Sequence, residues 1–199
     1  MKWVAVLLLS LIITSIQAME INADPRFITS FMDKTLLPEL DILRVTTEIS
    51  PENNLVFQIK TRGERLEGDH NDYLLLEILH DKAYLFLIPV NKEAGNNILI
   101  YENAFDPENY SLPKILENSK KNNFNLRVNR VIRGAEFIVP LAWFNFGADL
   151  GFDAYAIQAN IQGNQLQINK IYDQARIGNK EIKLFSAITL LNKLCSPKR

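Results

Sequence analysis

From Asp41 onward, short apolar runs alternate with polar turn residues, and this pattern predicts the strands of an antiparallel β-protein. The ten runs with the length of a strand are Ile42 to Ile49, Leu55 to Thr61, Tyr73 to Leu79, Ala83 to Val90, Ile98 to Tyr101, Phe124 to Val131, Ala135 to Val139, Phe152 to Ile161, Leu166 to Tyr172 and Lys183 to Leu191. Turn residues separate them: Gly163 and Asn164, for example, can adopt the positive φ that a tight hairpin requires. The pattern predicts an all-β fold, an antiparallel β-sandwich with immunoglobulin-like or jelly-roll-like layers.

One segment between these runs has the features of a short helix. Ser111 can cap a helix that starts at Leu112, and Pro113 is tolerated in a first turn. Lys120 and Lys121 would then lie near the C-terminal end, where positive charge is favourable. We therefore expect one short helix among the strands.

The spacing of apolar side chains distinguishes central strands from outer ones. Tyr73 to Leu79 and Ala83 to Val90 are apolar at nearly every position, which is typical of strands that are covered on both faces. The hairpin near residues 152–173 alternates instead. Its predicted inward positions are Tyr155, Ile157, Ala159, Ile161, Leu166, Ile168 and Tyr172. Its predicted outward polar positions are Gln158, Asn160, Gln165, Gln167, Asn169 and Asp173. We expect this hairpin to cover the core with one face only.

The first eighteen residues resemble a signal peptide. Lys2 precedes an apolar stretch from Trp3 to Ile13, and a short polar region then leads to Ala18, after which we expect cleavage. A membrane-spanning helix needs about 20 apolar residues, more than this stretch supplies. The sequence therefore predicts an exported protein, periplasmic or secreted, with no membrane span after the signal is removed.

The predicted domain organisation is a signal peptide over residues 1–18, a lead-in over 19–40 and one sandwich domain over 41–195. In the lead-in, an apolar group could line one side of a helix or cover a sheet edge; it comprises Phe27, Ile28, Phe31 and Met32. A length of 199 residues fits one domain. The single cysteine, Cys195, excludes an intramolecular disulfide, so the core alone must hold the fold.

Charge and composition exclude several functions. The chain has 22 Lys and Arg against 23 Asp and Glu, and this balance disfavours nucleic acid as the main partner. No nucleophile elbow, His-Glu-x-x-His pattern or glycine-rich phosphate loop occurs in the sequence. We therefore assign no catalytic residue.

A stretch in the second half of the chain carries a family resemblance. Glu136 precedes the pair Val139-Pro140, a large apolar residue follows at Phe144, and Leu150-Gly151-Phe152 comes next. The segment resembles the second half of a family-9 carbohydrate-binding module and the related sandwiches of the DOMON type. The resemblance spans roughly residues 41–191, with Leu184 to Leu190 as its closing strand. Physically, Pro140 should end a strand, and Trp143 and Phe144 should fill the end of the sandwich.

The resemblance implies sugar binding and, in some members, calcium or haem. Sugar-binding members clamp the ligand between aromatic rings, but Trp143 is the only tryptophan after residue 18 and lies within the structural motif. Haem would need Met or His ligands, and few are present, so we expect no haem. Asp69 and Asp72 are the nearest acidic cluster that could bind calcium, although calcium prefers six to eight oxygen ligands. His70, between them, is interpreted as an exposed loop residue rather than a zinc ligand.

The outward amides are the candidate ligand-binding residues. An amide offers a donor and an acceptor together and can pair with sugar hydroxyls. The candidate set is Gln158, Asn160, Gln165, Gln167 and Asn169, with Tyr155 and Tyr172 on the other face of the same hairpin. The alternative is that these amides form an ordinary solvated sheet face.

Three functions remain open at this point. The leading hypothesis is a non-catalytic binding module with a glycan as ligand. A secreted hydrolase would instead use two carboxylates in a cleft, with Glu136, Asp149 and Asp153 near the motif as candidates. A protein-interaction module would expose an apolar patch and an unprotected edge strand.

Overall fold

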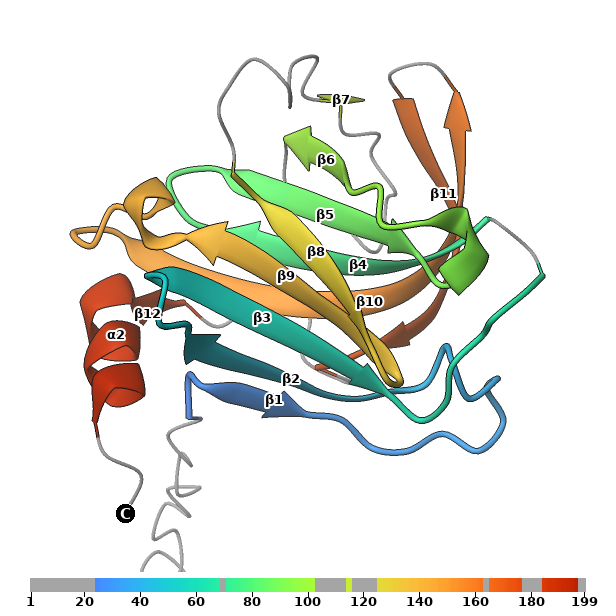
Figure 1. The fold of residues 1–199 in the computed structure, drawn as a ribbon, viewed down its shortest axis with the longest axis horizontal. Helices are drawn as coiled ribbons and strands as arrows, with labels where there is room; N and C mark the ends of the chain where they lie inside the picture. The colour runs from blue at the N-terminus through green and yellow to red at the C-terminus, as the bar shows by residue number, and fades with distance from the viewer. Residues whose placement is uncertain are drawn as a thin grey trace, which may run out of the picture.

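The computed structural model describes residues 24–68, 71–102, 114–115, 125–162, 165–176 and 184–196. Two antiparallel sheets face each other, as Figure 1 shows, so the predicted all-β sandwich is confirmed. The five-stranded sheet has the order β1-β2-β3-β9-β8, and the seven-stranded sheet the order β11-β7-β6-β5-β4-β10-β12. The predicted signal peptide lies outside the described residues.

The strands and helices are as follows. In the five-stranded sheet, β1 is Phe27–Thr29, β2 Ile42–Ile49, β3 Asn54–Thr61, β8 Arg127–Val131 and β9 Gly134–Pro140. In the seven-stranded sheet, β4 is Asp72–Leu79, β5 Ala83–Pro89, β6 Leu99–Glu102, β7 Lys114–Ile115, β10 Asp149–Gln162, β11 Gln165–Gln174 and β12 Phe185–Ser186. The helical segments among the described residues are the 3-10 turns η1 (Lys92–Ala94) and η2 (Leu141–Trp143) and the α-helix α2 (Ala187–Cys195).

The main core fills the space between the two sheets. Phe57 of β3 and Phe152 of β10 meet there edge to face, with ring centroids 5.2 Å apart. Each is at most 1% exposed. Burying one such side chain contributes about 1.5 to 3 kcal/mol. The side chains that face inward from each strand therefore hold the two sheets together.

The central strands β4 and β5 are covered on both faces, as predicted. Leu76 of β4 belongs to the core between the sheets, whereas its neighbour Leu75 belongs to a second apolar cluster on the outer face of the seven-stranded sheet. Tyr155 and Ile157 of β10 and Leu166 of β11 join that second cluster. The long hairpin of β10 and β11 thus bends over the outer face of β4 and β5 (Figure 1).

This bend corrects the expectation that the hairpin covers the core with one face only. Strand β10 is buried on both faces from Leu150 to Ile157. The pairing register between β10 and β11 shifts twice, and Asn169 and Tyr172 are the extra residues on β11 at the two shifts. Each extra residue reverses the alternation, so the two reversals cancel and Asp173 keeps the face of Gln165 and Gln167. Asp173, expected outward, is nevertheless 6% exposed, because its partner Ala156 faces the core between the sheets.

The prediction of a strand from Lys183 to Leu191 is also wrong. From residue 184, where the description of this segment begins, only Phe185–Ser186 pair with β10, and the chain then forms α2. Ala187 and Leu190 are buried, and Leu194 packs against the same core, which is a helical spacing of three and four. These apolar residues therefore lie on one face of a helix, and this helix covers the end of the sandwich.

The helix expected to start at Leu112 does not agree with the described part of that segment. Lys114–Ile115 form the short strand β7, which pairs with β6 and β11. The other residues of that expected helix lie outside the described ranges. A strand is favoured at 114–115 because the edge of β6 offers unpaired backbone groups there.

The lead-in contributes an edge strand. β1 pairs antiparallel with β2, and Ile28 and Leu40 are buried in the core. Phe27, Phe31 and Met32 are instead among the exposed apolar side chains. Of the two expectations for this segment, the sheet edge is the one observed for residues 27–29.

Candidate functional site

The predicted amides lie together on the hairpin of β10 and β11. Asn160 is directly opposite Gln167, and Gln162 is directly opposite Gln165. Gln165 and Gln167 are exposed, and Asn160 is half-buried. Directly opposite side chains of antiparallel strands are about 5 Å apart at Cβ. The hairpin therefore presents a compact ladder of amides near its turn.

Gln158 and Asn169, the other two predicted amides, do not face another amide across the hairpin. Gln158 is half-buried and faces Lys170, whereas Asn169 is exposed at a register shift. Lys170 extends over the ring of Tyr172, with Nζ 4.7 Å from the ring centroid. Sequence reasoning missed Gln162 and Lys170, which the pairing register places beside the predicted residues.

The two predicted tyrosines lie in different surroundings. Tyr155 is 2% exposed in the second apolar cluster, and its hydroxyl donates to Glu77 Oε2 over 3.4 Å. Burial raises the pKa of the Tyr155 hydroxyl. Tyr172 is half-buried and packs against the core between the sheets. The tyrosines thus do not form one aromatic surface.

Of the two predicted calcium residues, the described chain includes Asp72. Asp69 lies outside the described residues. Asp72 is 4% exposed, and its Oδ2 accepts from Arg65 Nη1 over 2.5 Å. The same arginine also pairs with Glu39. Among described residues, no group of three or more His, Cys, Asp and Glu side chains could hold a metal ion.

The three carboxylates named for a hydrolase are far from forming one site. Glu136 lies on the outer face of the five-stranded sheet and accepts from Gln58 Nε2 over 2.7 Å. Asp153 lies on the outer face of the other sheet and is 1% exposed. Asp149 is exposed, where β10 begins. The core thus separates the faces that carry Glu136 and Asp153.

A carboxylate pair does occur, but with a different partner. Asp153 is directly opposite Glu77 of β4, and Glu77 is 2% exposed. Burial raises the pKa of Asp153, although Gln174 Nε2 donates to its Oδ2 over 2.9 Å and opposes the shift. Sequence reasoning missed Glu77 because it stands in a strand that is otherwise apolar. A raised carboxyl pKa is typical of an active site, but these two carboxylates are nearly inaccessible, so a substrate could not reach them.

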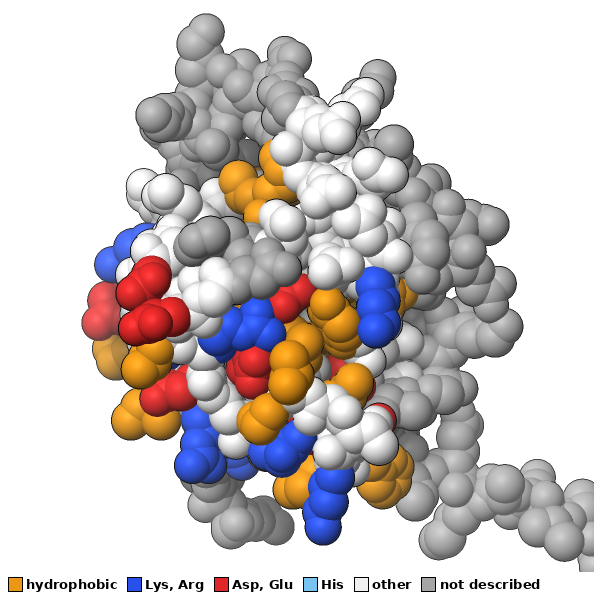
Figure 2. All heavy atoms as spheres, turned by 90° about the vertical axis from the view of Figure 1, so that its right-hand side faces the viewer, with side chains coloured by type: hydrophobic (Ala, Val, Ile, Leu, Met, Phe, Trp, Pro, Cys, Tyr) orange, Lys and Arg blue, Asp and Glu red, His pale blue; other side chains and the backbone are white. Residues whose placement is uncertain are grey.

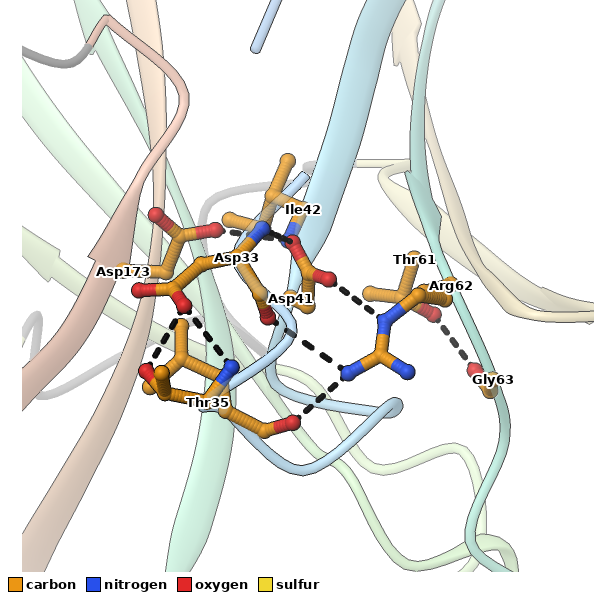
Figure 3. A network of polar contacts seen from close by, with 9 residues as sticks. Asp33, Thr35, Asp41, Ile42, Thr61, Arg62, Gly63 and Asp173 are labelled. Carbon is orange, nitrogen blue, oxygen red and sulfur yellow. Dashed lines mark hydrogen bonds and ion pairs between the residues drawn. The ribbon is translucent and has the colours of Figure 1, made fainter. Parts of the chain in front are cut away.

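A second acidic group links the two sheets (Figure 3). Asp173 of β11 accepts from the backbone N–H of Ile42 over 2.7 Å. Asp41 accepts from Arg62 Nε over 2.6 Å and from the backbone N–H of Asp33 over 3.2 Å. Burial raises the pKa of Asp173 to about 6, and the nearby Asp41 and Asp33 add to the rise. These carboxylates anchor the segment before β2 rather than open onto a cleft.

The Trp143 motif fills one end of the sandwich, as predicted. Its ring lies 4.6 Å from that of Tyr84 and 5.1 Å from that of Phe144, and β9 ends at Pro140. His80 packs beside Phe144 and bonds through both ring nitrogens, with the backbone N–H of Asn145 donating to Nε2. We therefore interpret this end as structural.

Figure 2 views the side of the molecule at the right of Figure 1, where the hairpin rises. Basic and acidic side chains lie side by side in its middle part, and basic and hydrophobic side chains lie toward its bottom. Arg65 pairs with Glu39 and Asp72, and Lys92 with Glu64. Each of these pairs brings opposite charges together, so these residues do not create a field of one sign.

Comparison with known proteins adds no relative. No family model matches the chain, and no curated protein or solved structure does so either. No helix in the described ranges combines the length and the apolarity needed to cross a bilayer.

Proposed function

We propose that this chain is an exported, non-catalytic binding module and that its ligand is a glycan. The observation that carries the proposal is the amide ladder on the hairpin of β10 and β11, where Asn160 faces Gln167 and Gln162 faces Gln165. Each amide supplies donors and an acceptor, which match the mixed donor and acceptor character of sugar hydroxyls.

The backbone geometry suits an extended ligand. Gln165, Gln167 and Asn169 are exposed and follow one another along β11. At about 3.4 Å per residue, they span about 14 Å, longer than a single ring needs. We therefore expect several linked sugar units to lie along the ladder.

Recognition at this surface should rest on hydrogen bonds rather than on stacking. The ring of Tyr155 is buried, and that of Tyr172 is covered in part by Lys170. Hydrogen bonds that replace bonds to water contribute modestly, about 0.5 to 1.5 kcal/mol each. The proposal therefore implies weak binding that grows with ligand length.

The alternatives have less support. A hydrolase needs substrate at its carboxylates, and Asp153 and Glu77 are 1% and 2% exposed. A protein partner would favour contiguous apolar surface, whereas the ladder is polar. The resemblance to family-9 carbohydrate-binding modules agrees with a glycan ligand.

A glycan array probed with the full chain tests the proposal. We expect binding to oligosaccharides, and a loss of about tenfold or more in the double variant Asn160→Ala/Gln167→Ala, since two bonding side chains are removed. Asn129→Ala, an exposed amide on β8, is the matched control and should bind normally. Circular dichroism confirms that each variant folds. Absence of glycan binding, or equal binding by the double variant, overturns the proposal.

A further inference from the structure

A separate hollow opens at the end of the five-stranded sheet where β9 finishes, left in Figure 1. Its volume is about 790 Å³, within the range of sites for small molecules. Its lining residues come from three segments and are Glu52, Asn53, Asn54, Asn125, Leu126, Arg127, Pro140, Leu141 and Ala142. The amide hairpin, at the right in Figure 1, lies at the other end of the molecule.

The frame of the hollow is fixed by backbone contacts. Asn53 has a φ of 59°, the left-handed conformation that Asn tolerates better than most residues. Its carbonyl accepts from Leu141 N over 3.0 Å, and Ser50 N donates to Asn54 O over 2.9 Å. The turn before β3 is therefore tied to the segment after β9, and the side chains at the rim start from a preorganised backbone.

The lining combines an apolar floor with a polar rim. Leu126, Pro140, Leu141 and Ala142 supply carbon surface on which one face of a sugar ring can lie. The amides Asn53 and Asn125 are exposed and can each donate and accept. This is the mixture that a ring with one apolar face and several hydroxyls requires.

Charge selects among such rings. Arg127 is exposed at the rim, and within the described part of the chain it makes no ion pair. A guanidinium binds a carboxylate in a two-point, planar geometry. Glu52 also lines the hollow, and hydrogen bonding by Ser50 lowers the pKa of its carboxyl. The Glu52 anion weakens the attraction of Arg127 for anions in general, and phosphate can form the same two-point contact. The preference for a uronate must therefore come from the sugar ring and its hydroxyls on the apolar residues and amides of the lining.

We propose that this hollow binds one hexuronate unit, with the sugar carboxylate on Arg127, its hydroxyls on Asn53 and Asn125, and its ring on the apolar floor. The inference shares the glycan ligand class with the proposed function but uses a different surface. It adds an acidic sugar to the ligand, as a chain end or as a free unit.

Titration of the ¹⁵N-labelled full chain with glucuronate, followed by NMR, tests this assignment, with glucose as the uncharged probe. We expect glucuronate to shift the signals of Asn53, Asn125 and Leu126. The shifts should be at least tenfold smaller with glucose at the same concentration. Arg127→Gln should remove this preference. Arg44→Gln, an exposed arginine on the same sheet, should retain it.

Several results would overturn the assignment: equal shifts with both sugars, an unchanged preference in Arg127→Gln, or displacement of glucuronate by an equal concentration of inorganic phosphate. A uronate-ended oligosaccharide that binds more tightly than glucuronate indicates a chain end as the natural ligand, and equal binding indicates the free unit; both support the hollow. The Asn160→Ala/Gln167→Ala variant should bind glucuronate normally, so failure of the hairpin proposal and failure of this one are distinguishable.

Discussion

Replacing Asp173 with Asn should make the stability of this protein less sensitive to pH between 7 and 5. The Asp173 carboxylate is 6% exposed and lies between the two sheets, where Ile42 N and Gln174 N donate to it over 2.7 and 2.8 Å. These two bonds favour the charged form, but burial outweighs them. The charged groups nearest to it in the network of Figure 3 are Asp41, Asp33 and Arg62.

The magnitude follows from the difference between folded and unfolded chains. The pKa of Asp173 rises from the ordinary 3.8 to about 6 on folding. A carboxyl shifted in this direction adds stability below the unfolded value and loses it as the pH rises through the folded value. Between pH 7 and pH 5, protonation of this one group should stabilise the fold by about 1.4 kcal/mol.

Urea denaturation at pH 7 and pH 5 measures the effect as a difference of unfolding free energies. We expect the gain at pH 5 to be about 1.4 kcal/mol smaller in Asp173→Asn than in the parent. The variant also loses one acceptor for a backbone N–H, which lowers its stability at both pH values and cancels in the difference. Asp81→Asn, an exposed carboxylate in the turn between β4 and β5, should leave the gain unchanged. An equal gain in the parent and Asp173→Asn would refute the reasoning.

Three further substitutions test the packing of the sandwich by equilibrium denaturation. Gly134→Ala should destabilise strongly, by about 3 kcal/mol or more, because φ is 143° and the new Cβ would lie 1.9 Å from Ile59 O. Arg62→Met should cost about 3 kcal/mol, because the Asp41 carboxylate, 0% exposed, would lose its ion-pair partner. Phe152→Ala should cost about 3 to 5 kcal/mol through the cavity left between the sheets.

Each of these has a matched comparison. Gly95→Ala also carries a positive φ, of 77°, but its Cβ would meet no atom within 4 Å, so the loss should be about 1 kcal/mol. Arg26→Ala breaks an ion pair with Asp24 that is partly open to solvent, and it should lower stability much less than Arg62→Met. Ile188→Ala, 54% exposed on α2, should likewise have a small effect. Losses as large as those of the partner variants would contradict the assigned causes.

The sequence alone was enough to predict the layers of this fold. Alternating side chains identified strands such as Ile42–Ile49, and the run at Tyr73 to Leu79, apolar at nearly every position, marked a strand covered on both faces. Pattern is sufficient here because side-chain burial repeats every two residues along a strand. Asn160 and Gln167 of the amide ladder were predicted for the same reason, since both lie between the hairpin turn and the first register shift.

The closing segment shows where this reasoning fails. The residues Ala187 to Leu194 are apolar at spacings that fit a strand in part and a helix in full. The spacing of Ala187, Leu190 and Leu194 was the available signal for a helix. Tertiary structure decided between the two, because β12 ends after two residues and the core exposes an end that a helix can cover.

Other features had no signal in the sequence. The hydrogen bond from Ile42 to Asp173 joins residues 131 positions apart, and Asp173 is buried because its partner on β10, Ala156, faces the core between the sheets. The hollow near Arg127 likewise needs three distant segments to meet. Local sequence determines which side chains prefer the interior and how often they recur. Pairing register, bulges and the meeting of distant segments are set by the packing of whole layers, because their free energies arise only once both partners are in place.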